Sequence, residues 1–212
     1  MTYPDLIGSE KSRWTLVLSH GAGASTASDF FDKFSMRLVE KGKKVGGIRL
    51  AIFDFPYMRK TISTGRRYFP DPMPKLQEAY LKVIDELNVE VGRLLIGGKS
   101  MGGRVASMVV ERSNASALVC LGYPFHPKKQ PDKHRTAHLK TISVPTLICQ
   151  GTRDPLGSLE EVTQYHLSSF IELVWLPDGD HDFMPRKRSG HTFGENLDKA
   201  VAEIIRFVNS LA

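Results

Sequence analysis

Short apolar runs alternate with helix-like patterns from residue 14 to the end of the chain. Six of these runs are five or six residues long and nearly continuous in apolar side chains, which is typical of strands buried on both faces. They cover residues 14–19, 48–53, 93–97, 117–121, 146–150 and 171–176. Because helical patterns separate these runs, we predict an α/β fold with a mostly parallel sheet and helices on both of its faces.

Capping residues and apolar periodicity indicate where the helices begin and end. Ser28 can cap a helix that Gly42 ends, and Pro74 stands at the start of another. Ser158 and Glu161 have the spacing of a capping box. The last helix has an apolar face made of Leu197, Val201, Ile204, Ile205, Val208 and Leu211. No repeat or linker interrupts this order, so we expect a single domain over residues 1–212.

Three connections are longer than the usual two to six residues of a strand-to-helix loop. They cover residues 54–74, 122–140 and 177–194, and each follows a predicted strand. In a parallel sheet they therefore gather at the carboxyl edge, where α/β folds bind their ligands.

Residues 98–102 read Gly-Lys-Ser-Met-Gly, a Gly-x-Ser-x-Gly pattern centred on Ser100. The pattern follows a predicted strand and opens a predicted helix, which is the setting that a nucleophilic serine on a sharp turn requires. The small flanking residues keep the turn clear of the neighbouring strand and helix. We take Ser100 as the candidate nucleophile; the alternative is a serine that only caps the helix.

A second glycine-rich segment, His20-Gly21-Ala22-Gly23-Ala24, follows the first predicted strand. Acyl transfer needs two backbone N–H donors directed at the oxyanion of the tetrahedral intermediate. Ala22 and Met101 are the candidates for this oxyanion hole. We expect His20 to brace the loop through hydrogen bonds, and we also keep it among the residues that could contact substrate.

An acid and a base should follow the nucleophile along the chain, each just after a strand. Asp154 follows the run 146–150 and His181 follows the run 171–176, so these two residues are the candidate acid and base. His181 would accept and return the serine proton, while Asp154 would orient the imidazole ring. The alternatives are Asp178, Asp180 and Asp182 for the acid and His191 for the base.

With these motifs in order, the sequence resembles the α/β-hydrolase superfamily over almost its whole length. The segments HGAGAS, GGKSMGGR, GTRDP and GDHDF are similar to those of a small dienelactone-hydrolase-like family with testis-expressed members and a nuclear acetyltransferase-complex subunit. The resemblance implies a three-layer fold of about six to seven strands, in which the usual opening hairpin is absent or reduced to one strand. Some members of the family serve as scaffolds, so the resemblance leaves catalysis open.

The formal net charge of +6 is not spread evenly. Residues 54–74, 122–140 and 182–191 together carry a net +8, which leaves the rest of the chain slightly acidic. This basic rim could steer an anionic substrate or partner to the site, or the long loops could simply carry solvating lysines and arginines. We do not expect nucleic acid as the main ligand, because no binding module is recognisable and the loops hold few aromatic side chains.

The connection 122–140 leaves room for a short flap and no large lid. Tyr57, Tyr123 and Phe125 are our candidates for the apolar walls of a rather open site. Such a site favours small soluble esters, thioesters or acylated surfaces over the substrates of an interfacially activated lipase.

We therefore predict a serine hydrolase that cleaves a carboxylic ester or related acyl bond without a cofactor or metal. Peptidase and perhydrolase chemistry use the same residues, and a non-catalytic scaffold that binds an acidic partner is the alternative. No apolar run is long enough to span a membrane and no secretory signal is recognisable, so we expect a cytoplasmic protein. Cys120 and Cys149 lie in apolar runs and are expected to be reduced packing residues.

Overall fold

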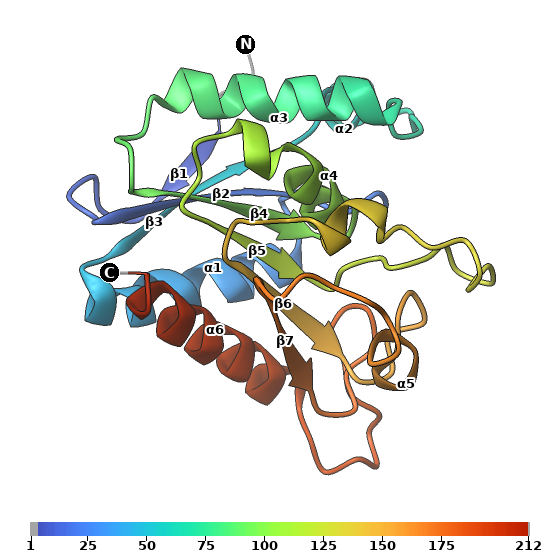
Figure 1. The fold of residues 1–212 in the computed structure, drawn as a ribbon. Coiled ribbons are helices and arrows are strands. Elements are labelled where there is room, and N and C mark those ends of the chain that lie inside the picture. Colours follow the sequence, from blue (N-terminus) through green and yellow to red (C-terminus); the bar gives the residue numbers. More distant parts are fainter. Residues whose placement is uncertain (1–3, 212) are drawn as a thin grey trace.

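The computed structural model describes residues 4–211, and its centre is a seven-stranded sheet in the order β1-β3-β2-β4-β5-β6-β7 (Figure 1). All neighbouring strands are parallel except β1, which is antiparallel to β3. The strands are β1 (Asp5–Ile7), β2 (Trp14–Ser19), β3 (Ile48–Phe53), β4 (Leu94–Lys99), β5 (Ala117–Leu121), β6 (Thr146–Gly151) and β7 (Ile171–Leu176). The predicted α/β fold is confirmed, and all six predicted strands are present.

Two helices cover one face of this sheet and three cover the other (Figure 1). Successive strand side chains point to opposite faces, so Leu16 and Leu18 of β2 pack toward the first pair while Val17 packs toward the other three. The first pair is α1 (Asp29–Gly42) and α6 (Phe193–Asn209), and the others are α2 (Pro56–Thr64), α3 (Met73–Leu87) and α4 (Met101–Val109). A short α5 (Leu159–Val162) precedes β7.

The predicted helix ends agree with the structure where caps mark them. Ser28 is the N-cap of α1, and Ser158 with Glu161 forms the predicted capping box of α5. A second capping box, which the sequence analysis missed, joins Thr192 to Glu195 at the start of α6. Its Thr-x-x-Glu spacing was readable in the sequence.

The prediction that residues 54–74 form one long loop is wrong. Pro56 occupies the first turn of α2, where its missing N–H costs nothing, and Gly65 ends that helix with φ of 67°. Tyr57 and Met58 anchor the helix by burying their side chains. At nine residues, α2 is too short to show a clear periodicity in the sequence.

The strand predicted over 93–97 begins one residue later and continues to Lys99, because Gly98 and Lys99 pair with Cys120 and Leu121 of β5. This extension carries β4 up to the turn that holds Ser100. Both cysteines are free and buried. Among residues 4–211, no helix is long and apolar enough to cross a bilayer.

Candidate active site

Ser100 lies on the turn between β4 and α4, at the carboxyl edge of the sheet. Its backbone has φ of 53° and ψ of −115°, a conformation that residues with side chains rarely adopt. A hydrogen bond from its N–H to the Leu121 carbonyl, 2.9 Å long, ties the turn to β5. The strained backbone projects the hydroxyl beyond the sheet, as the Gly-x-Ser-x-Gly pattern predicts.

The two glycines of the pattern are required by close packing. A Cβ atom on Gly98 would lie 2.5 Å from the carbonyl carbon of Gly102, and one on Gly102 would lie 2.3 Å from the Ser19 carbonyl oxygen. Both contacts are with backbone, which cannot move aside as a flexible side chain could. The turn between β4 and α4 can therefore pack against β2 only if these two positions carry no side chain.

Ser100, His181 and Asp154 form a continuous hydrogen-bonded chain, although 81 residues separate the first two in sequence. The Oγ atom of Ser100 lies 2.7 Å from Nε2 of His181, and Nδ1 of His181 lies 2.7 Å from Oδ2 of Asp154. In the tautomer that fits a carboxylate partner, Nδ1–H donates to Asp154 and Nε2 is free to accept the serine proton. The imidazole is partly open to solvent, whereas Asp154 is fully buried.

The Asp154 carboxylate is held by donors on both of its oxygens. Oδ1 accepts from the Leu156 N–H at 2.8 Å, and Oδ2 accepts from Nε2 of Gln150 at 2.8 Å. Gln150 is itself fixed, because its Oε1 accepts from the Tyr123 N–H at 2.7 Å. These bonds compensate for the burial of a carboxylate and fix the oxygen that faces His181.

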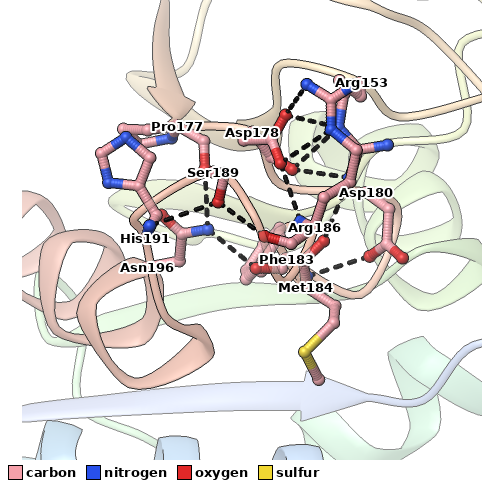
Figure 2. Close-up of polar contacts among 10 residues, drawn as sticks. All are labelled: Arg153, Pro177, Asp178, Asp180, Phe183, Met184, Arg186, Ser189, His191 and Asn196. Carbon is pink, nitrogen blue, oxygen red and sulfur yellow. Dashed lines mark hydrogen bonds and ion pairs between the residues drawn. The ribbon is translucent and has the colours of Figure 1, made fainter.

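The loop that carries His181 is held by polar contacts on both of its flanks (Figure 2). Asp178 pairs with Arg153 at 2.8 Å and with Arg186, whose hydrogen bonds hold the pKa of this carboxyl well below its usual range. Oδ1 of Asp180 accepts from the Met184 N–H at 2.9 Å. Asp178 and Asp180, two of the alternative acids, therefore shape the loop and are not hydrogen-bonded to His181.

The remaining alternatives also lie outside the hydrogen-bonded chain. Asp182, the third alternative acid, pairs with Lys99 at 3.0 Å. His191, the alternative base, is exposed near the start of α6, where its N–H donates to Oγ of Ser189 at 3.2 Å (Figure 2).

Lys99, which directly precedes Ser100, is a buried cation that ties the nucleophile strand to the His181 loop. Its ammonium donates to the His181 carbonyl at 2.8 Å and pairs with Asp182. Burial lowers the pKa of Lys99, and the neighbouring Asp182 partly offsets that effect. Through this bond to the loop backbone, Lys99 helps to fix the position of His181 relative to Ser100.

His20 braces the glycine-rich loop and does not line a cavity at Ser100. Its Nε2 accepts from the Phe55 N–H at 3.0 Å, and its Nδ1 donates to the Gly21 carbonyl at 2.6 Å. Burial lowers the pKa of His20, which favours the neutral ring that this donor and acceptor pair needs. Tyr57 supports the same loop by donating to the Ala22 carbonyl at 3.3 Å.

The two candidates for the oxyanion hole, Ala22 and Met101, both line a cavity that contains Ser100. Ala22 lines both of the cavities that contain Ser100, and Met101 is the first residue of α4, where a helix leaves its N–H groups without intrahelical acceptors. Within residues 4–211, neither N–H has a hydrogen-bond acceptor.

Two cavities, of about 460 and 340 Å³, open on either side of Ser100. Phe30, Lys99 and His181 line the larger cavity. Met73 and Leu76 of α3 line the smaller one. The two are separated at Ser100 and Ala22, which line both. A substrate could thus place one part on each side of the nucleophile.

The structure corrects the predicted apolar walls. Tyr123 and Phe125 are fully buried and Tyr57 is 4 % exposed, and none of the three lines either cavity. Tyr123 and Phe125 pack against each other with ring centroids 4.9 Å apart. Aromatic residues after a strand are as easily drawn into the core as into a pocket, and the sequence pattern does not distinguish the two.

Sequence reasoning missed two residues that hold this geometry, Lys99 and Gln150. Each had a signal, since Lys99 stands inside the serine motif and Gln150 is a polar residue at the end of an apolar strand. A polar residue in such a position must find buried partners. Which partners it finds depends on contacts across the sheet.

Solved structures similar to this chain share its fold at low sequence identity. A dienelactone hydrolase from Anabaena variabilis is 18 % identical, with a TM-score of 0.65 over 99 % of this chain and 95 % of its own. A lidless α/β serine hydrolase from Xanthomonas campestris is 17 % identical, with a TM-score of 0.66 over 97 % and 92 %. A monoacylglycerol lipase from Paleococcus ferrophilus is 14 % identical, with a TM-score of 0.69 over 100 % of both chains.

The sequence also matches a family as a whole. The family described as "Alpha/beta hydrolase domain" matches residues 12–209, which include the glycine-rich loop, Ser100, Asp154 and His181. With the parallel sheet, the serine turn and this match along nearly the whole chain, the protein belongs to the α/β hydrolase domain family.

Proposed function

We propose that this protein is a serine hydrolase that cleaves a carboxylic ester or related acyl bond through an acyl-enzyme intermediate. The observation that carries the proposal is the chain of two 2.7 Å hydrogen bonds from Ser100 through His181 to the buried Asp154. It joins a hydroxyl, a base and an orienting carboxylate in the order that nucleophilic catalysis by serine needs.

In this mechanism Oγ of Ser100 attacks the substrate carbonyl carbon while Nε2 of His181 takes its proton. The tetrahedral oxyanion accepts hydrogen bonds from the N–H groups of Ala22 and Met101. His181 then protonates the leaving alcohol as the acyl-enzyme forms. A water molecule, deprotonated by His181, attacks the acyl carbonyl and releases the acid, and the proton returns to Ser100.

Asp154 orients the His181 ring and stabilises the imidazolium that forms in each half-reaction. The N-terminus of α4 adds a favourable field at the oxyanion because its dipole is positive at that end. The site is preorganised before substrate binds. Gln150 holds Asp154, Lys99 holds the His181 loop, and His20 holds the glycine-rich loop.

The two cavities and the open edge support small substrates. The volumes of about 460 and 340 Å³ suit a small acyl group on one side of Ser100 and a small leaving group on the other. Esterases and a lidless serine hydrolase among the similar structures agree with this substrate class. The narrower kinship with dienelactone-hydrolase-like, testis-expressed and acetyltransferase-complex proteins is part of this proposal and rests on the four sequence motifs.

Labelling by a fluorophosphonate probe tests the proposal directly, because such a probe bonds only to an activated serine. We expect the wild-type protein to be labelled and Ser100→Ala to be unlabelled. Ser107→Ala is the matched control: Ser107 also contacts a histidine, with 2.8 Å between its Oγ and Nε2 of His138, but it is buried and joined to no carboxylate within residues 4–211. The control should label as the wild type does.

Turnover of 4-nitrophenyl acetate gives the second readout. Ser100→Ala and His181→Ala should each lower kcat by about four to six orders of magnitude, because the residues of such a chain act as a unit. A folded wild-type protein that neither takes up the probe nor hydrolyses the ester would contradict the proposal and favour the scaffold alternative.

A further inference from the structure

Two arginines face the smaller cavity beside Ser100 without an acidic partner. Arg104 follows Ser100 by one turn of α4, with its N–H bonded to the Ser100 carbonyl at 3.0 Å, and Arg135 reaches the cavity from the connection after β5. Both side chains are half-buried. Among residues 4–211, no carboxylate pairs with either guanidinium.

The two arginines have an unsatisfied donor and a lowered pKa that indicate an unfavourable environment for their charges. Nε of Arg104 is fully buried and has no hydrogen-bond acceptor within the described part of the chain. Burial and the charge of Arg104 lower the pKa of Arg135, and the same two causes lower the pKa of nearby His138. A buried donor without an acceptor and two adjacent like charges both destabilise the free protein, and an anion bound by the two guanidinium groups would relieve the repulsion between them.

The cavity wall holds one carboxylate, that of Asp71, whose Oδ2 is buried and has no hydrogen-bond partner in the described part of the chain. Its Oδ1 accepts from the Lys75 ammonium at 2.7 Å. Much of the remaining wall is apolar, with Met73, Leu76 and Leu156 among its residues. Two guanidinium groups against one carboxylate, which also pairs with Lys75, leave the cavity wall with a net positive charge.

We propose that this cavity is a subsite for an oxyanion carried by the substrate, a carboxylate or a phosphate, which Arg104 and Arg135 hold while the ester carbonyl lies at Ser100. The proposal rests on the serine hydrolase function proposed above and names its substrate class: esters with an anionic group on the part that enters this cavity. Arginine suits the role because its planar donors match carboxylate and phosphate oxygens in pairs.

The test compares esters that differ mainly in charge. We would measure kcat/KM for the 4-nitrophenyl monoester of glutaric acid, for 4-nitrophenyl 4-phosphonobutanoate and for the neutral 4-nitrophenyl hexanoate, each corrected for hydrolysis without enzyme. The wild type should prefer at least one anionic ester to the neutral one. Which of the two it prefers distinguishes a carboxylate subsite from a phosphate subsite.

Arg135→Gln and Arg104→Met should each lower kcat/KM for the preferred anionic ester by about tenfold to a hundredfold, the effect of losing a hydrogen bond to a charged group. The neutral ester should change by less than about threefold, within the range of small uncharged effects. Arg112→Gln is the matched control, because Arg112 follows α4, is exposed, and contacts Gln77 away from the cavity. If Arg104→Met does not fold, Arg135→Gln alone decides.

Failure of the subsite and failure of the hydrolase function give different results. An enzyme that takes the fluorophosphonate label, cleaves charged and neutral esters alike and keeps that ratio in the arginine variants overturns the subsite and leaves the hydrolase. If no ester is cleaved and no label is taken up, titration of Ser100→Ala with glutarate and with inorganic phosphate decides on the subsite. Binding that Arg135→Gln abolishes supports it, and absence of binding overturns it.

Discussion

Asp154 is the residue on which the geometry of the site depends most, although it is fully buried and far from Ser100 in sequence. Its two oxygens receive donors from Gln150, Leu156 and His181. An acceptor is therefore required at both oxygens. The neutral amide of asparagine offers only one acceptor atom and turns a donor toward groups that donate.

Asp154→Asn should lower kcat for 4-nitrophenyl acetate by about ten-thousandfold, because the amide favours the wrong tautomer of His181. Steady-state kinetics of the purified variant measure this. Asp178→Asn is the comparison, since that carboxylate was an alternative acid and pairs with Arg153 and Arg186 instead. Equal losses in the two variants would mean that Asp154 has no special part in catalysis.

At the residue scale, the sequence predicted the three residues of the hydrogen-bonded chain correctly and the aromatic residues of the pocket wall incorrectly. Ser100, His181 and Asp154 could be proposed because each stands just after a strand, in a fixed order along the chain. Tyr57, Tyr123 and Phe125 were placed on a pocket wall that they do not form. An apolar residue near an edge can turn inward or outward, and only its packing neighbours decide.

At the scale of elements, the site depends on how closely β4 and α4 approach β2. Gly98 and Gly102 leave no space for a methyl group, and the backbone of Ser19 forms part of the boundary for both. The turn between them carries the strained Ser100. Any added volume must push the turn away from the sheet and so move the hydroxyl relative to His181.

Gly98→Ala and Gly102→Ala should each lower the free energy of unfolding by about 1–3 kcal/mol, the usual cost of overpacking. Each should also lower kcat more than the loss of folded protein explains. Urea denaturation and ester hydrolysis measure the two effects. Gly23→Ala is the matched control for stability, because a Cβ there meets no atom within 4 Å. Unchanged stability in all three variants would contradict the packing argument.

The elements themselves were largely legible from the sequence. All six predicted strands are present, because buried parallel strands leave continuous apolar runs. The short α2 was missed. The three-residue β1 is not one of the six apolar runs, but as a single strand antiparallel to β3 it agrees with the opening hairpin reduced to one strand that the resemblance allows. Short elements depend on their neighbours more than on their own pattern.

At the scale of the whole molecule, the excess positive charge lies in segments that follow strands of the parallel sheet. The segments 54–74, 122–140 and 182–191, which together carry a net +8, come after β3, β5 and β7, whose carboxyl ends meet at one edge of the sheet. Lys128 and Lys129 are exposed members of this basic rim. We expect such a distribution to attract anions toward the two arginines of the smaller cavity.

The rate on an anionic ester should therefore depend on salt. Between ionic strengths of about 0.01 and 0.15 M the screening length falls from roughly 30 to 8 Å, so kcat/KM for the 4-nitrophenyl glutarate monoester should fall several-fold. The value for 4-nitrophenyl hexanoate should stay nearly constant. The double variant Lys128→Gln, Lys129→Gln should show a shallower salt dependence than the wild type. Equal salt dependence for both esters would exclude steering by the rim.

The sequence by itself determined the α/β fold, the order of the strands along the chain and the candidates for nucleophile, acid and base. Apolar runs, caps and the Gly-x-Ser-x-Gly turn act over a few residues, so they are written locally in the chain. The tertiary structure decided which donors hold Asp154, where Lys99 ties the His181 loop, which aromatic rings enter the core and that Arg104 and Arg135 share one cavity. These contacts join segments tens of residues apart, and only the packing of the sheet and its helices brings them together.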